Sequence, residues 1–239
     1  MTTFENLGLN FPLFAASVQE AARYRGPSTC VLCRSAHPHC FEVDDLILPC
    51  PACGTLTALS ADDAEDTSCT SCDTTVSFPG TSETDEAVVC TPCLRAGRAA
   101  FTQNTELGMV RWEDAQRGRT HGLPGSVPTG FAVITDADGW HQVYVPSEVL
   151  LELVRTPRYR TLQGENWLFC HGRVMTYLGT WQRADFERAA PDGNGRDLFT
   201  RMIEDADPSL WEYADGGELM FYAFRCVACG TLRAHWDAT

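Results

Sequence analysis

The second half of the chain alternates apolar and polar residues with the periods of short strands and helices. Residues 131–135 and 140–145 are apolar runs on either side of the turn sequence Asp138-Gly139, which predicts a β-hairpin. The apolar residues of segment 147–154 share one helical face, so we expect a helix that Pro157 ends. The pattern therefore predicts a hairpin followed directly by a helix.

The last third of the chain predicts a mixture of strands and helices. Residues 173–178 and 219–225 have the composition of strands, and residues 196–204 place their apolar side chains on one side of a helix. A return strand is expected at residues 231–236. Because strands and helices are mixed in this order, we expect an α+β fold, with residues 102–239 forming a small mixed body.

The amino-terminal residues 1–29 are expected to form a helical arm that packs on this body. They open with an apolar cluster and continue into residues 15–24, where a short helix is predicted. Gly26-Pro27 would end that helix, because proline cannot continue it. Further along, we expect residues 95–101 to be helical and the polar residues 102–128 to form a long connection.

The cysteines add a metal-binding pattern to this fold. In each of five pairs two residues separate the cysteines, so a tight turn can aim both sulfurs at one point, and two pairs supply the four thiolates that zinc prefers. The pairs are Cys30/Cys33, Cys50/Cys53, Cys69/Cys72, Cys90/Cys93 and Cys226/Cys229. We therefore expect Zn²⁺ as the cofactor and a zinc-ribbon and knuckle region at residues 30–101.

Spacing suggests how the first four pairs combine. Fifteen residues separate Cys53 from Cys69, which fits a self-contained zinc ribbon inserted at about residues 48–80. The outer pairs, at residues 30–33 and 90–93, would then share another zinc ion. The alternative joins neighbouring pairs in order, the first with the second and the third with the fourth. We favour the nested arrangement.

The last cysteine pair needs two more ligands, which would make a carboxyl-terminal zinc knuckle that closes the body. Cys170 and His171 are the first candidates, and His235 is another. Adjacent residues on a strand point to opposite faces, so both can bind one metal only if the chain bends there, as Gly172 would permit. We expect Cys170, the last pair and one histidine to form the site. The alternative leaves Cys170 as a small buried apolar residue.

The first pair has spare ligands, because His37, His39 or Cys40 could replace one of its cysteines. Cys40-Phe41-Glu42 followed by Pro49-Cys50-Pro51-Ala52-Cys53 also matches the zinc motif of nucleobase deaminases. Only six residues lie between its halves, too few for the helix and strand that place them in those enzymes. The chain has no HExxH, Walker or GxSxG motif, so we assign no catalytic residue and favour a non-enzymatic role.

The net charge of the chain indicates which classes of partner it can bind. The formal net charge is -14, and all 18 residues counted as lysine or arginine are arginines. None lies between Arg34 and Arg95, where acidic residues are frequent. Such a chain is not expected to bind nucleic acid directly or to bind an anionic membrane. The acidic segment is either a solvated loop or a surface that attracts a basic protein partner.

The cysteine thiols, together with the lack of a signal-peptide pattern and of a membrane-span pattern, predict the cellular compartment. The amino terminus does not have the basic and apolar regions of a signal peptide, and no apolar run approaches the roughly 20 residues of a membrane span. Thiols stay reduced in the cytosol, where paired cysteines hold metal more often than they form disulfides. We therefore expect a cytoplasmic protein.

Several segments together resemble the CbrC family of cysteine-rich bacterial proteins. They are the Cys-x-x-Cys run at 88–101, the helix ending in Arg155-Thr156-Pro157 at 146–157, the Trp-Leu segment 164–168, Tyr177-Leu178-Gly179, and the carboxyl-terminal segments 224–230 and 235–237. The likeness covers roughly residues 30–40 and 88–239 and depends on the order of these motifs. Against that family the ribbon looks like an insertion, and the order Cys170-His171 is reversed.

The resemblance has two implications. Short family members keep the outer cysteine pairs without the inner ones, which supports the nested arrangement. The family is associated with tolerance to a DNase-type colicin and has no established enzymatic activity.

The leading hypothesis is therefore a cytosolic, non-catalytic zinc protein that gives tolerance or immunity to a nuclease-type bacteriocin by binding its basic toxin domain. One alternative is a zinc-dependent enzyme that uses a site at Cys170, His171, Cys226 and Cys229. Another is a zinc-ribbon adaptor in a nucleic-acid machine.

Overall fold

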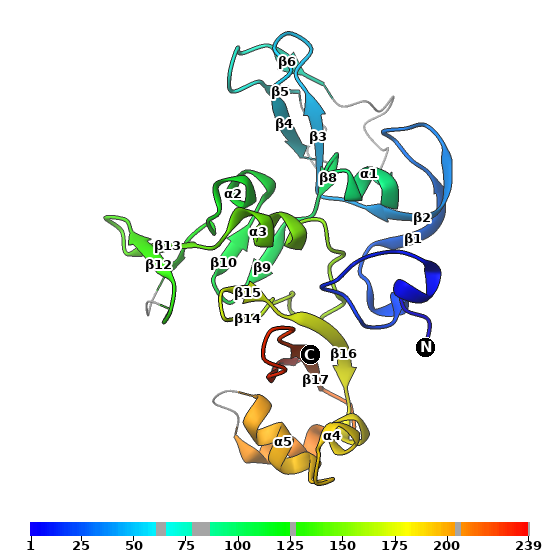
Figure 1. Ribbon diagram of the computed structural model, residues 1–239, viewed down its shortest axis with the longest axis vertical. Helices are drawn as coiled ribbons and strands as arrows, with labels where there is room; N and C mark the ends of the chain where they lie inside the picture. The colour runs from blue at the N-terminus through cyan, green and yellow to red at the C-terminus, as the bar shows by residue number, and fades with distance from the viewer. Residues whose placement is uncertain (61–65, 78–86, 125–127, 204–206, 239) are drawn as a thin grey trace. The chain divides into compact units, whose positions relative to one another are not determined.

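The computed structural model describes residues 1–60, 66–77, 87–124, 128–203 and 207–238. The chain divides into two compact units (Figure 1). Unit 1 contains residues 1–21, 104–106 and 159–239, and unit 2 contains residues 22–103 and 107–158. Short helices and small sheets are mixed along the chain, which confirms the α+β class.

Unit 2 opens with a three-stranded antiparallel sheet in the order β1-β2-β7. Its strands are β1 (Tyr24–Thr29), β2 (Ala36–Glu42) and β7 (Val88–Cys90). Helix α1 (Thr91–Arg95) follows β7 without a loop. The turn between β1 and β2 carries the first cysteine pair, so the sheet brings together two cysteine pairs that are far apart in the sequence.

The predicted ribbon lies between these strands in the sequence. It contains β3 (Asp45–Pro49), β4 (Leu56–Ser60), β5 (Thr67–Ser68) and β6 (Thr75–Val76). Strand β3 pairs with β4 and also with β8 (Ala99–Ala100). The apolar cluster of the ribbon is small, because its buried residues are Cys50, Leu59, Cys69 and Val76. Two of these four are predicted metal ligands, so little apolar burial remains to hold the ribbon without metal.

The chain after β8 is richer in structure than the sequence pattern predicts. Strand β9 (Gln103–Thr105) extends into the part of unit 1 at residues 104–106. The elements of unit 2 that follow are β10 (Gly108–Val110), α2 (Trp112–Arg117), β11 (Leu123–Pro124), β12 (Ala132–Thr135), β13 (Trp140–Tyr144) and α3 (Ser147–Leu153). The predicted hairpin and helix are confirmed as β12–β13 and α3. The prediction of a long connection at 102–128 is wrong, because α2 buries Trp112 and Ala115 and contacts α3.

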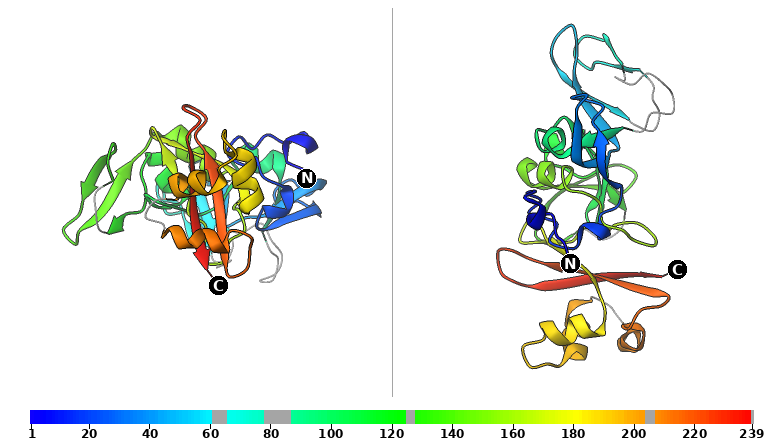
Figure 2. Two further views of the ribbon diagram at one scale, coloured as in Figure 1. Left: turned by 90° about the horizontal axis from the view of Figure 1, so that it is seen from below. Right: turned by 90° about the vertical axis from the view of Figure 1, so that its right-hand side faces the viewer.

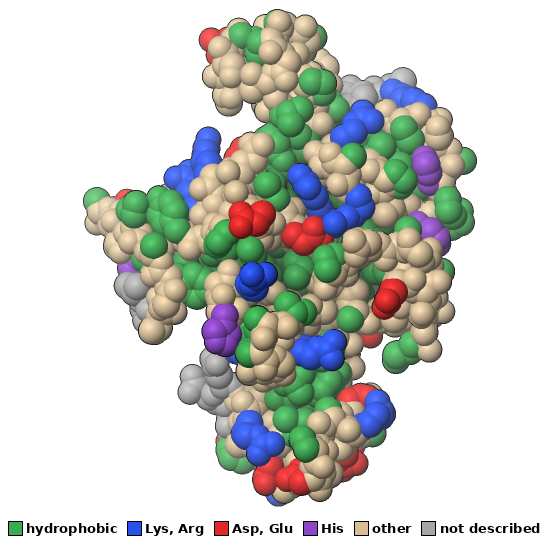
Figure 3. Space-filling view, in the orientation of Figure 1, with side chains coloured by type: hydrophobic (Ala, Val, Ile, Leu, Met, Phe, Trp, Pro, Cys, Tyr) green, Lys and Arg blue, Asp and Glu red, His purple; other side chains and the backbone are tan. Residues whose placement is uncertain are grey.

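The β12–β13 hairpin presents an apolar face to solvent. Ile134 and Tyr144 are exposed, and Trp140 is 48% exposed. Ile134 lies opposite Gln142, and Trp140 and Tyr144 lie two residues to either side of Gln142. The three exposed apolar side chains therefore share one face of the hairpin. Figure 3 shows hydrophobic side chains gathered over this projecting segment.

Unit 1 is built on a three-stranded antiparallel sheet in the order β16-β17-β18. Its strands are β16 (Thr176–Trp181), β17 (Leu219–Arg225) and β18 (Leu232–Ala238). Figure 2 shows the β17–β18 hairpin in orange and red, with helices along one side of it. These are α4 (Arg183–Ala189), α5 (Gly195–Met202) and the 3-10 helix η3 (Pro208–Tyr213). The predicted strand at 219–225 and the return strand are confirmed. The helix predicted at 196–204 is confirmed as α5, and residue 204 lies outside the described residues.

Aromatic side chains form a second core in unit 1. Tyr159 stacks on Tyr177 with ring centroids 4.4 Å apart, and its ring also meets Trp167 and Phe224 edge-on. All four are fully buried or nearly so. The short hairpin of β14 (Phe169–Cys170) and β15 (Arg173–Val174) follows Trp167 in the sequence. The core therefore lies next in sequence to the hairpin that carries Cys170.

The helical arm predicted at residues 1–29 is wrong. The helical turns of the arm are the 3-10 turns η1 (Glu5–Leu7) and η2 (Val18–Glu20), its last residues belong to β1, and no α-helix forms at residues 15–24. The backbone N–H of Ala15 donates instead to the carbonyl of Tyr177 at 2.9 Å, and Ala21 forms a bridge with Tyr159. Pairing with other segments thus satisfies backbone groups that a helix would have satisfied locally.

The helix predicted at residues 95–101 is also wrong. Helix α1 lies one turn earlier and ends at Arg95. Gly97 then adopts φ +74°, and a Cβ there would lie 2.6 Å from Nη2 of Arg155. This glycine turns the chain into β8, which pairs with β3. Ala99 and Ala100, small residues that suit a helix, therefore lie in strand β8.

Candidate metal centres

Four of the five cysteine pairs lie in the same kind of turn. In each, the N–H of the first cysteine donates to the carbonyl five residues on, and the residue after the second cysteine donates back to the first cysteine, at 2.8–3.0 Å. That residue has a left-handed backbone in every case, with φ between 54° and 76°, and the four residues are Arg34, Gly54, Asp73 and Gly230. The repeated geometry is what aims two sulfurs at one point.

The fifth pair uses a helix instead of a turn. Cys90 ends β7 and is the N-cap residue of α1, and Cys93 lies in the helix after Pro92. Proline is suited to the first turn of a helix, because its missing N–H is not needed there. The strand-to-helix junction therefore turns both sulfurs toward the knuckle between β1 and β2.

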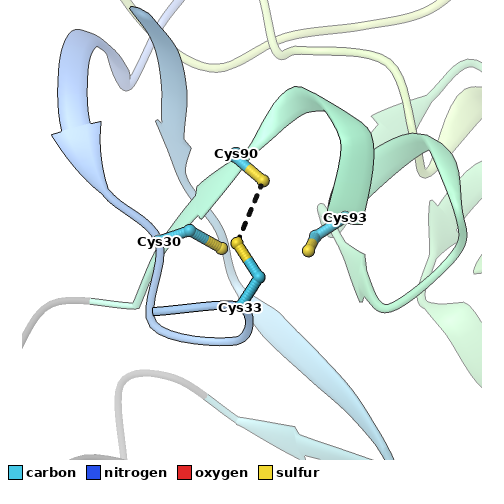
Figure 4. A group of neighbouring side chains, drawn as sticks. All are labelled: Cys30, Cys33, Cys90 and Cys93. Atoms are coloured by element: carbon cyan, nitrogen blue, oxygen red, sulfur yellow. Dashed lines mark hydrogen bonds between the residues drawn. The ribbon is translucent and has the colours of Figure 1, made fainter. Parts of the chain in front are cut away.

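The first site brings together Cys30, Cys33, Cys90 and Cys93 (Figure 4). The four sulfurs lie within 4.8 Å of one another, and those of Cys33 and Cys90 are 3.8 Å apart. Three of the four residues are buried. The group lies in unit 2 and links the β1–β2 turn to α1.

The second site brings together Cys50, Cys53, Cys69 and Cys72 of the ribbon. Sulfur distances of 3.5 Å join Cys50 to Cys72 and Cys53 to Cys69. The structure therefore groups the cysteines of unit 2 in the nested arrangement and not in neighbouring order. The first site spans the ribbon in the sequence.

The third site, in unit 1, brings together Cys170, His171, Cys226 and Cys229. The sulfurs of Cys170 and Cys229 are 3.7 Å apart, and Nδ1 of His171 is 3.1 Å from the Cys170 sulfur. His171 and Gly172 have φ values of 53° and 69°, so they are the two central residues of a turn that joins β14 to β15. The strand ends at Cys170, so adjacent ligands can face one point.

The structure places the other candidate ligands elsewhere. His235 belongs to the aromatic core, where its Nε2 lies 2.6 Å from the hydroxyl of Tyr159. Nδ1 of His39 is 2.6 Å from the hydroxyl of Tyr24. The Cys40 sulfur faces two backbone carbonyls. Because Cys40 is not grouped with Cys50, the deaminase arrangement is absent from the described residues.

His37 and Arg98 contact ligands of the first site without joining the group. Nε2 of His37 is 3.4 Å from the Cys33 sulfur, and Nη1 of Arg98 is 3.8 Å from the Cys93 sulfur. Four thiolates and one divalent cation carry a net charge of minus two. Hydrogen-bond donors beside the sulfurs offset part of that charge.

Threonine hydroxyls support the sulfurs at the other two sites. The hydroxyl of Thr55 lies 3.3 Å from the Cys53 sulfur, and that of Thr231 lies 3.1 Å from the Cys229 sulfur. Hydrogen bonding from these hydroxyls lowers the pKa of each cysteine to about 6. The sequence carries a signal for this contact, because Cys-Gly-Thr-Leu occurs at residues 53–56 and again at 229–232. The role of its threonine emerges only from the structure.

Burial acts in the opposite direction, so that ionisation of all four sulfurs depends on a positive charge beside them. It raises the pKa of the Cys170 thiol to about 12, and the neighbouring sulfurs of Cys226 and Cys229 add to the effect. Burial also raises the pKa of Cys90. Four sulfurs this close cannot all ionise by themselves, whereas a bound cation deprotonates coordinating thiols. The three groups of four Cys and His residues are thus positioned to bind metal ions.

Comparison with known proteins places this chain among its relatives. The model of the uncharacterised protein family UPF0167 matches residues 51–238. The chain belongs to the UPF0167 family. A UPF0167 protein of Pseudomonas aeruginosa, PA1536, is 30% identical over 100 residues, which are 39% of this chain and 52% of the relative. The chain thus spans about half the length of the relative it matches.

The family match also bears on the resemblance to the CbrC family and on the expected function. The UPF0167 match is to a family described as uncharacterised, so it does not confirm the CbrC name and it brings no activity. No solved structure matches the chain. Among the residues that the structure describes, no helix has both the length and the apolar character to cross a membrane.

Proposed function

We propose that this UPF0167 protein is a cytoplasmic, non-catalytic zinc protein whose metal ions hold a surface for a basic protein partner. One observation carries the proposal: three groups of side chains each offer four Cys or His ligands to one point. Four soft sulfur and nitrogen ligands make the closed tetrahedral set of structural zinc. Sites of this kind serve stability and shape.

The ligand sets favour a structural role over catalysis. A catalytic zinc site keeps three protein ligands and one open position for water. Each group here supplies four ligands, and in the described residues none of the groups includes a carboxylate. A zinc hydrolase normally needs such a group as its general base. The third site is more exposed than the other two and would be the first candidate for a catalytic site, but its group already offers four ligands.

The basic partner is proposed from charge. The net charge is -14, and no arginine lies between Arg34 and Arg95. Many of the acids in that segment lie outside the described residues, and these are Asp62, Asp63, Glu65, Glu83, Asp85 and Glu86. A segment of one sign attracts a partner of the other sign and speeds its association. The resemblance to the CbrC family suggests the nuclease domain of a bacteriocin as that partner.

The test measures binding of the zinc-loaded protein to the isolated, catalytically inactive nuclease domain of a DNase-type colicin. We expect binding that weakens as salt is raised, because the attraction between exposed charges is screened. Changing Asp62, Asp63 and Glu65 to their amides should weaken binding. The matched control changes Glu187, Glu212 and Glu218 to glutamine, which alters the net charge equally in exposed positions of unit 1.

Two outcomes would overturn this proposal. The first is an absence of binding together with no protection of cells that express the protein. The second is equal weakening by both sets of substitutions, which would show that net charge and not the acidic segment is responsible.

A further inference from the structure

Unit 2 contains a polar pocket of about 550 Å³ that none of the metal sites uses. Three arginines contribute to its wall, from the start of β1, the start of α2 and the end of the segment after α3. They are Arg23, Arg111 and Arg158. A volume of this size is typical of pockets for small molecules. The three guanidinium groups make an anion the natural ligand.

A buried carboxylate positions two of these arginines. Asp44 is 9% exposed, and one of its oxygens pairs with Nη1 of Arg23 and lies 3.8 Å from Nη1 of Arg158. Its other oxygen accepts the N–H of Thr102 at 2.8 Å. Asp44 therefore contacts residues that line the pocket, and it holds the guanidinium groups of Arg23 and Arg158 in place.

The backbone also contributes to this arrangement. Arg23 has φ 59°, a left-handed conformation that a side chain with a Cβ rarely adopts. Its carbonyl accepts the N–H of Glu42 at 3.0 Å, and the carbonyl of Arg158 accepts the N–H of Ala22 at 2.7 Å. The two arginines are thus fixed through their main chains as well as through Asp44.

Arg111 completes the cationic side of the pocket. It is exposed, and within the described part of the chain its guanidinium has no hydrogen bond or ion pair. The hydroxyls of Ser60, Thr67 and Thr102 also line the pocket. Hydroxyl and guanidinium groups together are the donors that recognise phosphate and carboxylate oxygens.

We propose that this pocket binds a small molecule through one phosphate or carboxylate group, which Arg111 and Arg158 contact. The lining holds three carboxylates against its three arginines, namely Asp44, Asp45 and Glu113. This balance suits a ligand with a single anionic group and a polar remainder, and disfavours a polyanion. The ligand is a phosphorylated or carboxylated small molecule, and the two sources share the same oxyanion chemistry.

The experiment titrates the zinc-loaded, full-length protein with inorganic phosphate and, separately, with acetate at constant ionic strength. The signals of arginine Nε–Hε groups are followed by NMR. We expect a saturable shift for Arg111 and Arg158 with at least one of the two anions. The anion that binds more tightly identifies the source of the oxyanion.

The decisive variant is Arg111→Gln, which removes the exposed guanidinium without disturbing Asp44. Loss of one charge-assisted contact should weaken binding by about tenfold or more. The control is Arg117→Gln, at an exposed arginine of the same helix that does not line the pocket. Thermal melts check that both variants are folded.

Shifts that grow linearly without saturation for both anions would overturn the proposal. So would a dissociation constant that Arg111→Gln leaves unchanged, or one that Arg117→Gln raises equally. Neither arginine belongs to the three groups of metal ligands, so the result is independent of the proposed partner and of the metal sites.

Discussion

At the scale of single residues, hydrogen bonds decide which cysteines ionise readily. Thr231 places its hydroxyl 3.1 Å from the Cys229 sulfur, and hydrogen bonding to it lowers the pKa of that cysteine to about 6. Thiolate is the form that binds metal, so this contact favours metal binding before the metal arrives. A residue that is not a ligand thus contributes to the third site.

Replacing Thr231 by valine tests this contact, because valine keeps the shape and removes the hydroxyl. We expect zinc bound at the third site to be lost to a chelator about tenfold faster or more. The control is Thr200→Val, whose hydroxyl is exposed on α5 and donates to a backbone carbonyl. Equal zinc loss from both variants would contradict the role given to Thr231.

His235 is the residue whose charge state should make unit 1 sensitive to acid. Burial lowers its pKa to about 4, so the ring is neutral in the folded protein at neutral pH, and its Nε2 lies 2.6 Å from the Tyr159 hydroxyl. The unfolded chain, with a pKa near 6.5, therefore binds more protons than the folded chain between about pH 4 and 6.5. Stability should be constant above that window and fall as pH decreases through it.

The loss should reach roughly 3 kcal/mol at most by about pH 4. The measurement is the free energy of unfolding of the wild type and of His235→Phe at several pH values, with zinc content followed in parallel. The phenylalanine variant should lose this part of the pH dependence. Parallel curves for the two proteins would exclude His235 as the cause.

At the scale of elements, cysteines positioned to bind metal make up half of the small apolar core of the ribbon, whereas the first site lies beside a larger core. The ribbon cluster contains four buried residues, and two of them are the ligands Cys50 and Cys69. The first site instead joins α1 to a sheet of three strands, and Leu94 and Phe101 nearby are fully buried. Losing metal should therefore have different consequences at the two sites.

Cys53→Ser and Cys93→Ser test this difference. We expect the first to unfold β4, β5 and β6 while the rest of unit 2 stays folded, and the second to destabilise the unit as a whole. Structural zinc sites contribute on the order of 10 kcal/mol in small domains, so both effects should be large. Hydrogen exchange separates them by location. Equal melts with exchange spread over the whole unit in both variants would contradict the expectation.

Single elements show where the sequence pattern succeeds and where it fails. The β12–β13 hairpin and α3 follow from alternation and periodicity, because their signals are local. The helix predicted at 15–24 does not form, since Ala15 and Ala21 pair with other segments. Helix α4 (Arg183–Ala189) was not identified, because its only buried residue is Phe186 and a helical stripe is absent.

At the scale of the whole molecule, the number of zinc ions bound per chain tests the proposed structural role of the three sites. Three groups of four ligands predict three zinc ions per chain. Elemental analysis should give three for the wild type and two for Cys229→Ser. The control is Cys40→Ser, which removes a buried thiol outside the three groups and should keep three. Two ions in both the wild type and Cys229→Ser would mean that the third site does not hold zinc.

The sequence by itself determined that the cysteine pairs can offer ligands to metal, because each Cys-x-x-Cys pair carries its geometry in a turn of a few residues. It also favoured the nested arrangement over the neighbouring one, and it predicted the hairpin and the helix from local patterns. Only the tertiary structure decided that His171 belongs to the third site and His235 to an aromatic core. It also brought Arg23, Arg111 and Arg158 to one pocket. The reason is physical: local spacing fixes the direction of neighbouring side chains, whereas contacts between distant segments depend on how whole elements pack.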